Sequence, residues 1–120
     1  VDPKAGGTSG NYLNGLFQRM GIADEVKKKA VYGMQGSQVA AAVADGRAEL
    51  GMTFISEMMP NKGVKIAGLL PAAVQNATPY TVAIPANAPN PDAARAFIAA
   101  MRTPEARQAI SHAGLEPLPK

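Results

Sequence analysis

The sequence predicts an α/β fold, a three-layer domain with helices on both faces of one sheet. Short apolar runs bounded by Gly and Pro alternate with stretches whose apolar residues recur at helical spacing. Residues 50–55 are apolar on both faces, which is typical of a strand buried in a parallel sheet. With residues 30–32 and the helical stretch between them, they predict a right-handed βαβ crossover. The length of 120 residues predicts a single domain, residues 1–120.

Two further strands are expected at residues 64–70 and 80–84, where apolar and β-branched residues gather. Four helices are expected, each with a capping residue or Pro at its start or a Gly at its end. The boundaries that these signals predict are, in chain order, Gly21, Ser37, Gly46, Asn90, Thr103 and Gly114.

The composition excludes several classes of function. The chain has no Cys and one His, which excludes disulfides, thiol catalysis and multi-histidine metal sites, so no metal and no cofactor are expected. Its 12 Lys and Arg against 9 Asp and Glu leave a net charge of +3, too small and too scattered for a nucleic-acid-binding surface. No apolar run has the length of a membrane span, and no export signal is visible in the chain.

The groups that catalysis would need are scattered along the chain. Glu49, Glu57 and Glu105 lie in separate segments, and they are interpreted as surface residues. Ser111 and His112 are neighbours on an expected helix, where adjacent side chains do not face each other, and no GxSxG motif occurs. The sequence therefore predicts a binding protein that is not an enzyme.

One loop has the features of an anion site. Thr8, Ser9, Gly10 and Asn11 follow a Gly pair and lead directly into an expected helix. The first turn of a helix leaves backbone N–H groups without intrahelical partners and with a partial positive charge, so it can hold an oxyanion without Lys or Arg. The alternative is a purely structural role without a ligand, since Thr8 or Ser9 would equally serve as an N-cap beside a glycine turn.

A second loop has the same construction. Gly36 and Ser37 lie between an expected strand and an expected helix. Loops at the carboxyl ends of parallel strands gather at one edge of a sheet, so the two helix starts would face one ligand. Phe54 ends the expected buried strand at the same edge, either as a core residue or as a ligand contact.

Several segments, in this order, resemble the second lobe and C-terminal region of a type II periplasmic solute-binding protein of an ABC importer. The resemblance runs nearly end to end, and within that class it is greatest for molybdate-binding proteins. The segments that carry it are TSGNY at 8–12, VADGRAELGM at 43–52, KGVKI at 62–66, PYTVAI at 79–84, ARAF at 94–97, PEA at 104–106 and AGL at 113–115.

The resemblance implies that residues 1–120 form one lobe and that a small oxyanion, molybdate-like, or another small anionic solute binds between two lobes. By this resemblance Ser9 and Gly10 supply the first contact and Gly36, beside Ser37, the second. Phe54 takes the place of a Tyr in molybdate binders, and Phe has no hydroxyl to donate.

The resemblance also implies the partners and the location. The first lobe of the same protein is expected to precede Val1, an ABC permease in the membrane would recognise the closed form, and the location would be periplasmic. An exposed cleft face would favour a dimer of the isolated piece. The alternative is the effector-binding domain of a LysR-type transcription regulator, which a DNA-binding winged helix upstream would distinguish.

Overall fold

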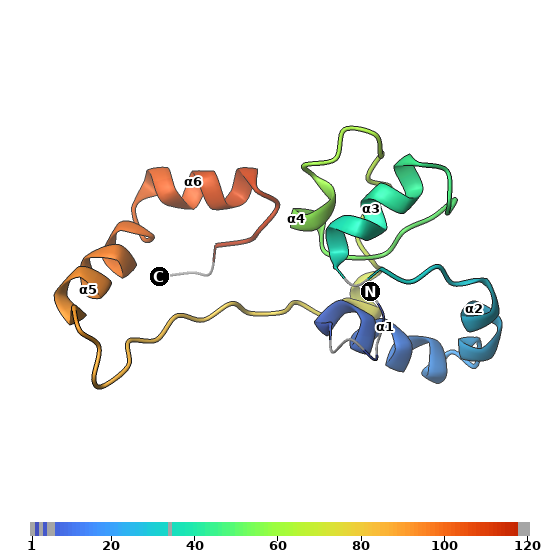
Figure 1. The fold of residues 1–120 in the computed structure, drawn as a ribbon, viewed down its shortest axis with the longest axis horizontal. Helices are drawn as coiled ribbons and strands as arrows, with labels where there is room; N and C mark the ends of the chain where they lie inside the picture. The colour runs from blue at the N-terminus through green and yellow to red at the C-terminus, as the bar shows by residue number, and fades with distance from the viewer. Residues whose placement is uncertain (1, 3, 5–6, 34, 118–120) are drawn as a thin grey trace. The chain divides into compact units, whose positions relative to one another are not determined.

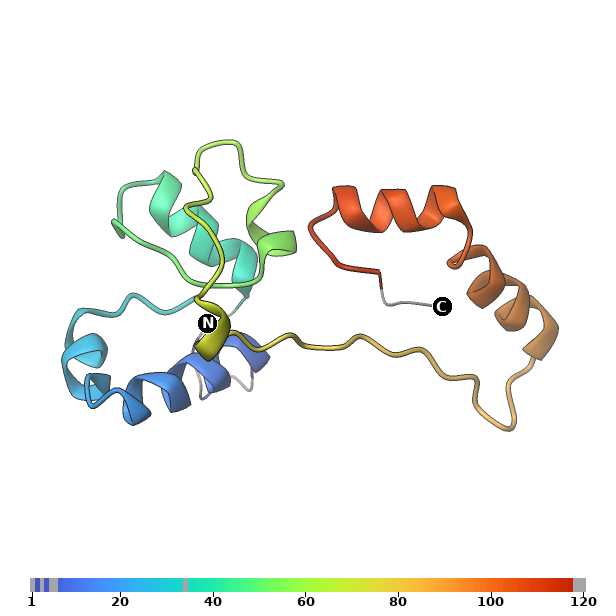
Figure 2. The same cartoon turned by 180° about the vertical axis from the view of Figure 1, so that it is seen from behind.

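The structure is a computed structural model, and it describes residues 2, 4, 7–33 and 35–117. The chain forms two compact units, Val1–Thr78 and Pro79–Lys120. Figures 1 and 2 show helices joined by long irregular segments within each unit.

In residues 7–33 and 35–78, the first unit contains four α-helices and a short 3-10 helix. These elements are α1 (Thr8–Arg19), α2 (Ala23–Lys29), α3 (Gly36–Ala44), α4 (Ile55–Met58) and η2 (Ala72–Val74). Helix α1 packs against α2, and α3 packs against α4, as Figure 2 shows for the second pair. Helix α2 has acidic residues in its first turn and three Lys in its last, the order of charges that the helix dipole favours.

The helix ends follow from local sequence. Helix α1 stops before Gly21, which has a φ of 71° and donates from its N–H to the Gln18 carbonyl oxygen at 3.0 Å. Ile22 donates to the Phe17 carbonyl oxygen at 3.0 Å, which completes a Schellman motif. Gly46 and Gly114 end α3 and α6 in the same way, so the three predicted glycine ends are confirmed.

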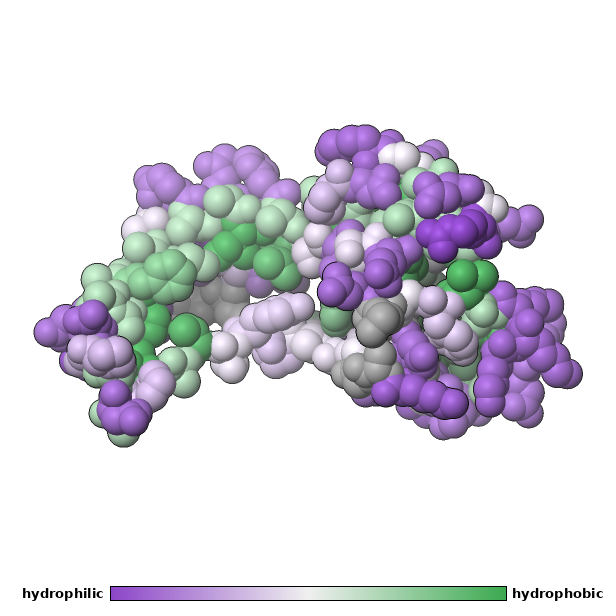
Figure 3. Space-filling model, viewed as in Figure 1, coloured by the Kyte–Doolittle hydropathy of each residue, from purple (hydrophilic) through white to green (hydrophobic). Residues whose placement is uncertain are grey.

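The second unit contains α5 (Pro91–Ala100) and α6 (Pro104–His112). Each begins with Pro at its first position, as predicted, because the fixed φ of Pro suits a helix start. The Thr103 hydroxyl caps α6 by accepting from the Ala106 N–H at 3.3 Å. Apolar side chains gather over α5 and α6 in Figure 3. Phe97 of α5 and Met101, which follows this helix, are both exposed.

Two predictions of secondary structure are wrong. The part of the chain that the structure describes contains helices and no strand, so the three-layer α/β sheet and its βαβ crossover are not formed. A strand exists only when its backbone pairs with a neighbour, and residues 30–32, 50–54, 64–70 and 80–84 run as irregular chain without ladder partners. Ser37 is not the cap of α3, since the helix begins at Gly36 and its N-cap is Gln35, two residues before Ser37.

The absence of a sheet among the described residues leaves a small core. Its buried apolar side chains are those of Leu16, Ala40 and Ala42. Leu69 is 69% exposed and Val82 is 64% exposed, although both lie in segments that a sheet would have buried. No helix in the described part of the chain combines the length and the apolar character that crossing a bilayer requires.

Candidate functional site

A cavity of about 310 Å³ lies within the first unit. Its wall takes residues from α1, α3 and α4 and from the irregular segments that follow α3 and α4. Polar side chains in this wall include Ser9, Tyr12, Thr53 and Lys65, and apolar side chains make up most of the remainder. This volume is at the lower end of the range for small-molecule sites, roughly 300 to 1,000 Å³.

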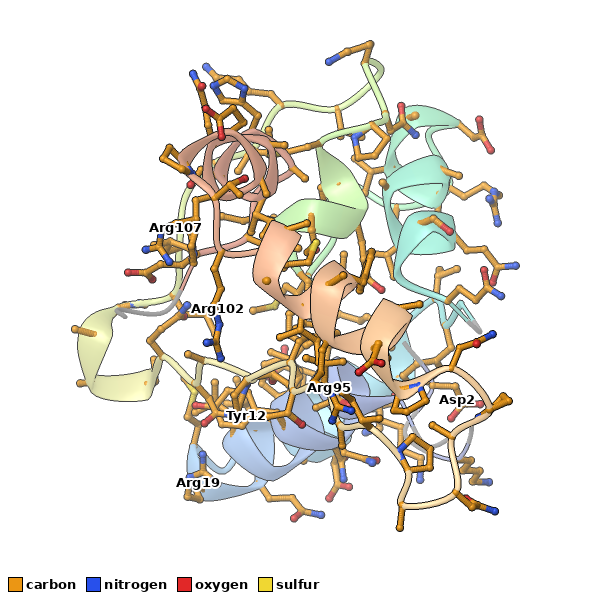
Figure 4. The ribbon with its side chains drawn as sticks, turned by 90° about the vertical axis from the view of Figure 1, so that its left-hand side faces the viewer. Asp2, Tyr12, Arg19, Arg95, Arg102 and Arg107 are labelled. Carbon is orange, nitrogen blue, oxygen red and sulfur yellow. The ribbon has the colours of Figure 1, made fainter. Side chains whose placement is uncertain are left out.

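Tyr12 connects α1 to η2. Its hydroxyl donates a hydrogen bond to the Val74 carbonyl oxygen in η2, in a half-buried position. The Arg19 guanidinium lies 5.9 Å from the centre of the Tyr12 ring, within the range of a cation–π contact. Figure 4 shows both side chains on α1. These contacts hold the aromatic ring in the cavity wall.

The start of α1 brings one predicted site residue to the cavity. Ser9 is 8% exposed and lines the wall, whereas Thr8 and Asn11 are exposed and Gly10 is buried. The N-cap residue is Gly7, and no side chain caps the helix. Helix geometry leaves the backbone N–H groups of the first turn without intrahelical acceptors, so the positive end of the α1 dipole lies at Ser9.

The start of α3 is arranged differently from the start of α1. Gly36 is buried and Ser37 is exposed, and neither lines the cavity. A Cβ placed on Gly36 would come within 1.8 Å of Glu57 Oε2, so the Glu57 carboxylate lies directly against this glycine. The chain's own carboxylate is thus next to the helix start where the sequence predicted a bound anion.

Glu57 is held by two donors. The Thr53 hydroxyl donates to its carboxylate, and the Phe54 backbone N–H donates to Oε2 at 3.4 Å. Glu57 is half-buried, so its interpretation as a surface residue is wrong. A sequence signal was present, because Glu at the third position of a helix commonly accepts from the N-cap backbone N–H, and here the N-cap is Phe54.

Phe54 lines the cavity with a half-buried ring. The structure therefore brings Ser9 and Phe54 to one cavity and puts Gly36 beside Glu57. Among the described residues, no three His, Asp or Glu side chains gather as a metal site would require. Ser111 and His112 are both exposed on α6.

One relative of this chain has the name of an enzyme. A protein of Pseudomonas sp named aconitate isomerase is 37% identical to this chain over 112 residues, which is 92% of this chain and 42% of that protein. The chain therefore spans less than half the length of this curated relative. No solved structure matches the chain. The prediction that the protein is not an enzyme is contradicted by this comparison, because the relative carries the name of an enzyme.

The family is shown by a match that covers nearly the whole sequence. Residues 1–116 match the family described as bacterial extracellular solute-binding protein. Of the two classes that the sequence left open, this match supports the solute-binding class over the transcription regulators. The solute-binding class is confirmed, and the chain belongs to the bacterial extracellular solute-binding proteins.

Proposed function

We propose that this chain supplies part of the site of a solute-binding protein for a small carboxylate anion, and that the complete protein isomerises this anion. The observation that carries the proposal is the 37% identity, over 92% of the chain, to a protein named aconitate isomerase. Aconitate is a small unsaturated tricarboxylate, so it belongs to the class of anionic solutes that the sequence predicts.

The polar part of the cavity supports binding of carboxylates. Ser9 brings a hydroxyl group to its wall and Lys65 brings an ammonium group, whereas the Tyr12 and Thr53 hydroxyls already donate to Val74 and Glu57. Hydroxyl and ammonium groups donate hydrogen bonds to carboxylate oxygens, and the ammonium group adds a charge-assisted bond. The positive end of the α1 dipole lies at Ser9 and favours negative charge at the same wall.

The apolar part of the cavity favours a carboxylate over a tetrahedral oxyanion such as molybdate. Leu13, Val39 and Ile55 lie in the same wall as the polar groups. The carbon skeleton of a tricarboxylate has apolar surface that such side chains would cover, whereas a tetrahedral oxyanion presents oxygen in every direction. Phe54, which has no hydroxyl, adds to the apolar part.

The proposal includes the expected place of the chain in a larger protein. We propose that residues 1–120 form one lobe, that another part of the complete protein supplies the first lobe, and that the solute is bound between them by hinge closure. For a role in transport, the proposed partner is an ABC permease in the membrane and the proposed location is the periplasm. The family is consistent with both.

The test uses the complete protein that contains this chain. Calorimetric titrations with cis-aconitate, trans-aconitate, molybdate and sulfate measure binding, and proton NMR measures conversion between the two aconitate isomers. We expect saturable binding of aconitate, its interconversion and no binding of molybdate. Binding of molybdate or sulfate without aconitate would overturn the carboxylate proposal, and binding of aconitate without conversion would overturn the isomerase part.

A further inference from the structure

The wall of the cavity in the first unit carries charges of both signs. They belong to Lys65 and Glu49, and every other described residue in the wall is uncharged. Glu49 lies on the irregular segment that follows α3, and Lys65 lies on the one that follows α4. The cavity therefore presents an ammonium group and a carboxylate to a solute, in a wall whose other side chains are mostly apolar.

Neither charge is neutralised by another residue in the part of the chain that the structure describes. Lys65 and Glu49 form no ion pair with each other, and neither side chain has a hydrogen bond with a described residue. The ion pairs of that part lie outside the cavity wall, Lys29 with Glu25, Arg47 with Asp45 and Arg95 with Asp92. Lys65 and Glu49 are exposed, so water solvates both charges. Both are thus available to interact with a solute.

Ser9 adds a hydroxyl group without a protein partner to the same wall. Its side chain forms no hydrogen bond with a described residue, although Ser9 is only 8% exposed. The Tyr12 and Thr53 hydroxyls, by contrast, already donate to Val74 and Glu57. A nearly buried hydroxyl without a protein partner needs water or a ligand to complete its hydrogen bonds. Ser9 and Lys65 are therefore donors whose hydrogen bonds a carboxylate can accept.

We infer that Lys65 binds one carboxylate of the solute and that Glu49 repels the others, and this inference rests on the proposed binding of a tricarboxylate. An ammonium group holds a carboxylate by a charge-assisted hydrogen bond. The apolar side chains of the wall exclude water, which strengthens this attraction and equally strengthens the repulsion between Glu49 and a second carboxylate. The two charges thus orient the solute, with one carboxylate at Lys65 and the other two directed away from Glu49.

The experiment measures the dissociation constant of cis-aconitate by calorimetry in the complete protein and its variants. Lys65→Met removes the charge and keeps the length of the side chain, so we expect it to raise Kd by about 5- to 50-fold. Glu49→Gln removes the negative charge at nearly constant volume and should lower Kd by about 2- to 5-fold. The matched controls, Lys62→Met and Asp24→Asn, remove charges from exposed residues outside the wall and should change Kd by less than about twofold.

Salt provides a second measurement of the same attraction. Raising NaCl from about 0.05 M to about 0.5 M should weaken binding to the unaltered protein more than binding to Lys65→Met, because salt screens an attraction that this variant lacks. Equal salt dependence of the two proteins would contradict the role of Lys65.

The outcomes separate the two proposals. If the unaltered protein does not bind cis-aconitate, the proposed function fails. If it binds and Lys65→Met binds equally well, only the assignment of Lys65 is overturned. Weaker binding to Glu49→Gln than to the unaltered protein would overturn the repulsive role of Glu49. Circular dichroism checks the folding of each variant, and should Lys65→Met not fold, Lys65→Gln is measured against the same limits.

Discussion

At the scale of single residues, Gly36 and Glu57 depend on each other. The carboxylate occupies the space that a side chain at position 36 would need, and it accepts from Thr53 and Phe54 in that position. The sequence identifies Gly36 as a candidate for ligand binding because it precedes a helix. It does not show that a carboxylate from α4 lies against it, because this contact joins segments far apart in the chain.

Gly36→Ala is expected to lower the free energy of unfolding of the first unit by about 1 to 2 kcal/mol, because the new methyl group displaces the carboxylate from its two donors. In a Glu57→Ala background the same substitution should cost much less. Urea titrations of the four proteins give the coupling energy, which we expect near 1 kcal/mol. Additive effects of the two substitutions would contradict the contact.

Tyr12→Phe is expected to destabilise the first unit by about 1 kcal/mol, because it removes the donor to the Val74 carbonyl oxygen in a half-buried position. Thermal unfolding measures the effect. The matched control is Tyr32→Phe, since Tyr32 is 49% exposed and loss of its hydroxyl should change stability by less than about 0.5 kcal/mol. Equal melting temperatures for the two variants would argue against a stabilising hydrogen bond at Tyr12.

At the scale of secondary-structure elements, the helices obey local rules and the expected strands do not form. Helix α1 ends at Gly21, and α6 begins at Thr103 with its hydroxyl cap, as the sequence predicts. Their hydrogen bonds join residues three to five positions apart, so nearby sequence is enough to specify them. Residues 64–70 and 80–84 have strand-like composition, but a strand also needs a partner elsewhere in space.

Substitution by Ala is expected to have opposite effects on stability at two glycines, one inside α1 and one just after its end. Gly15 is in the helix interior, where a Cβ would meet the Arg19 side chain at an ordinary 3.6 Å, so Gly15→Ala should stabilise the unit by about 0.5 to 1 kcal/mol. Gly21 has a φ of 71°, so Gly21→Ala should destabilise it by about 1 kcal/mol. Chemical denaturation of both variants tests the assigned end of α1, and the same sign for both would contradict it.

At the scale of the whole molecule, each of the two units leaves large apolar side chains exposed. Its buried apolar side chains, in the part that the structure describes, are one Leu and two Ala. Large apolar residues such as Leu69 and Val82 are exposed in segments without backbone partners. Such surfaces are typical of interfaces, and unpaired extended segments favour edge-to-edge association.

The isolated chain of 120 residues is therefore expected to self-associate. Sedimentation velocity over a range of concentrations should show a dimer that dissociates on dilution. Val82→Lys should weaken the association by replacing an exposed apolar side chain with a charge, and Thr81→Lys, which adds the same charge next to it, should weaken it less. A monomer at every concentration would contradict the prediction.

By itself, the sequence predicted α1, α3, α5 and α6, the glycine and proline boundaries of these helices and the solute-binding family, but neither α2 nor α4. These features depend on neighbouring residues or on a pattern along the whole chain, and the sequence contains both kinds of information. Only the tertiary structure decided that the expected strands have no partners, and that Glu57 lies against Gly36. The physical reason is that pairing and packing join residues distant in sequence, whereas helix formation is local.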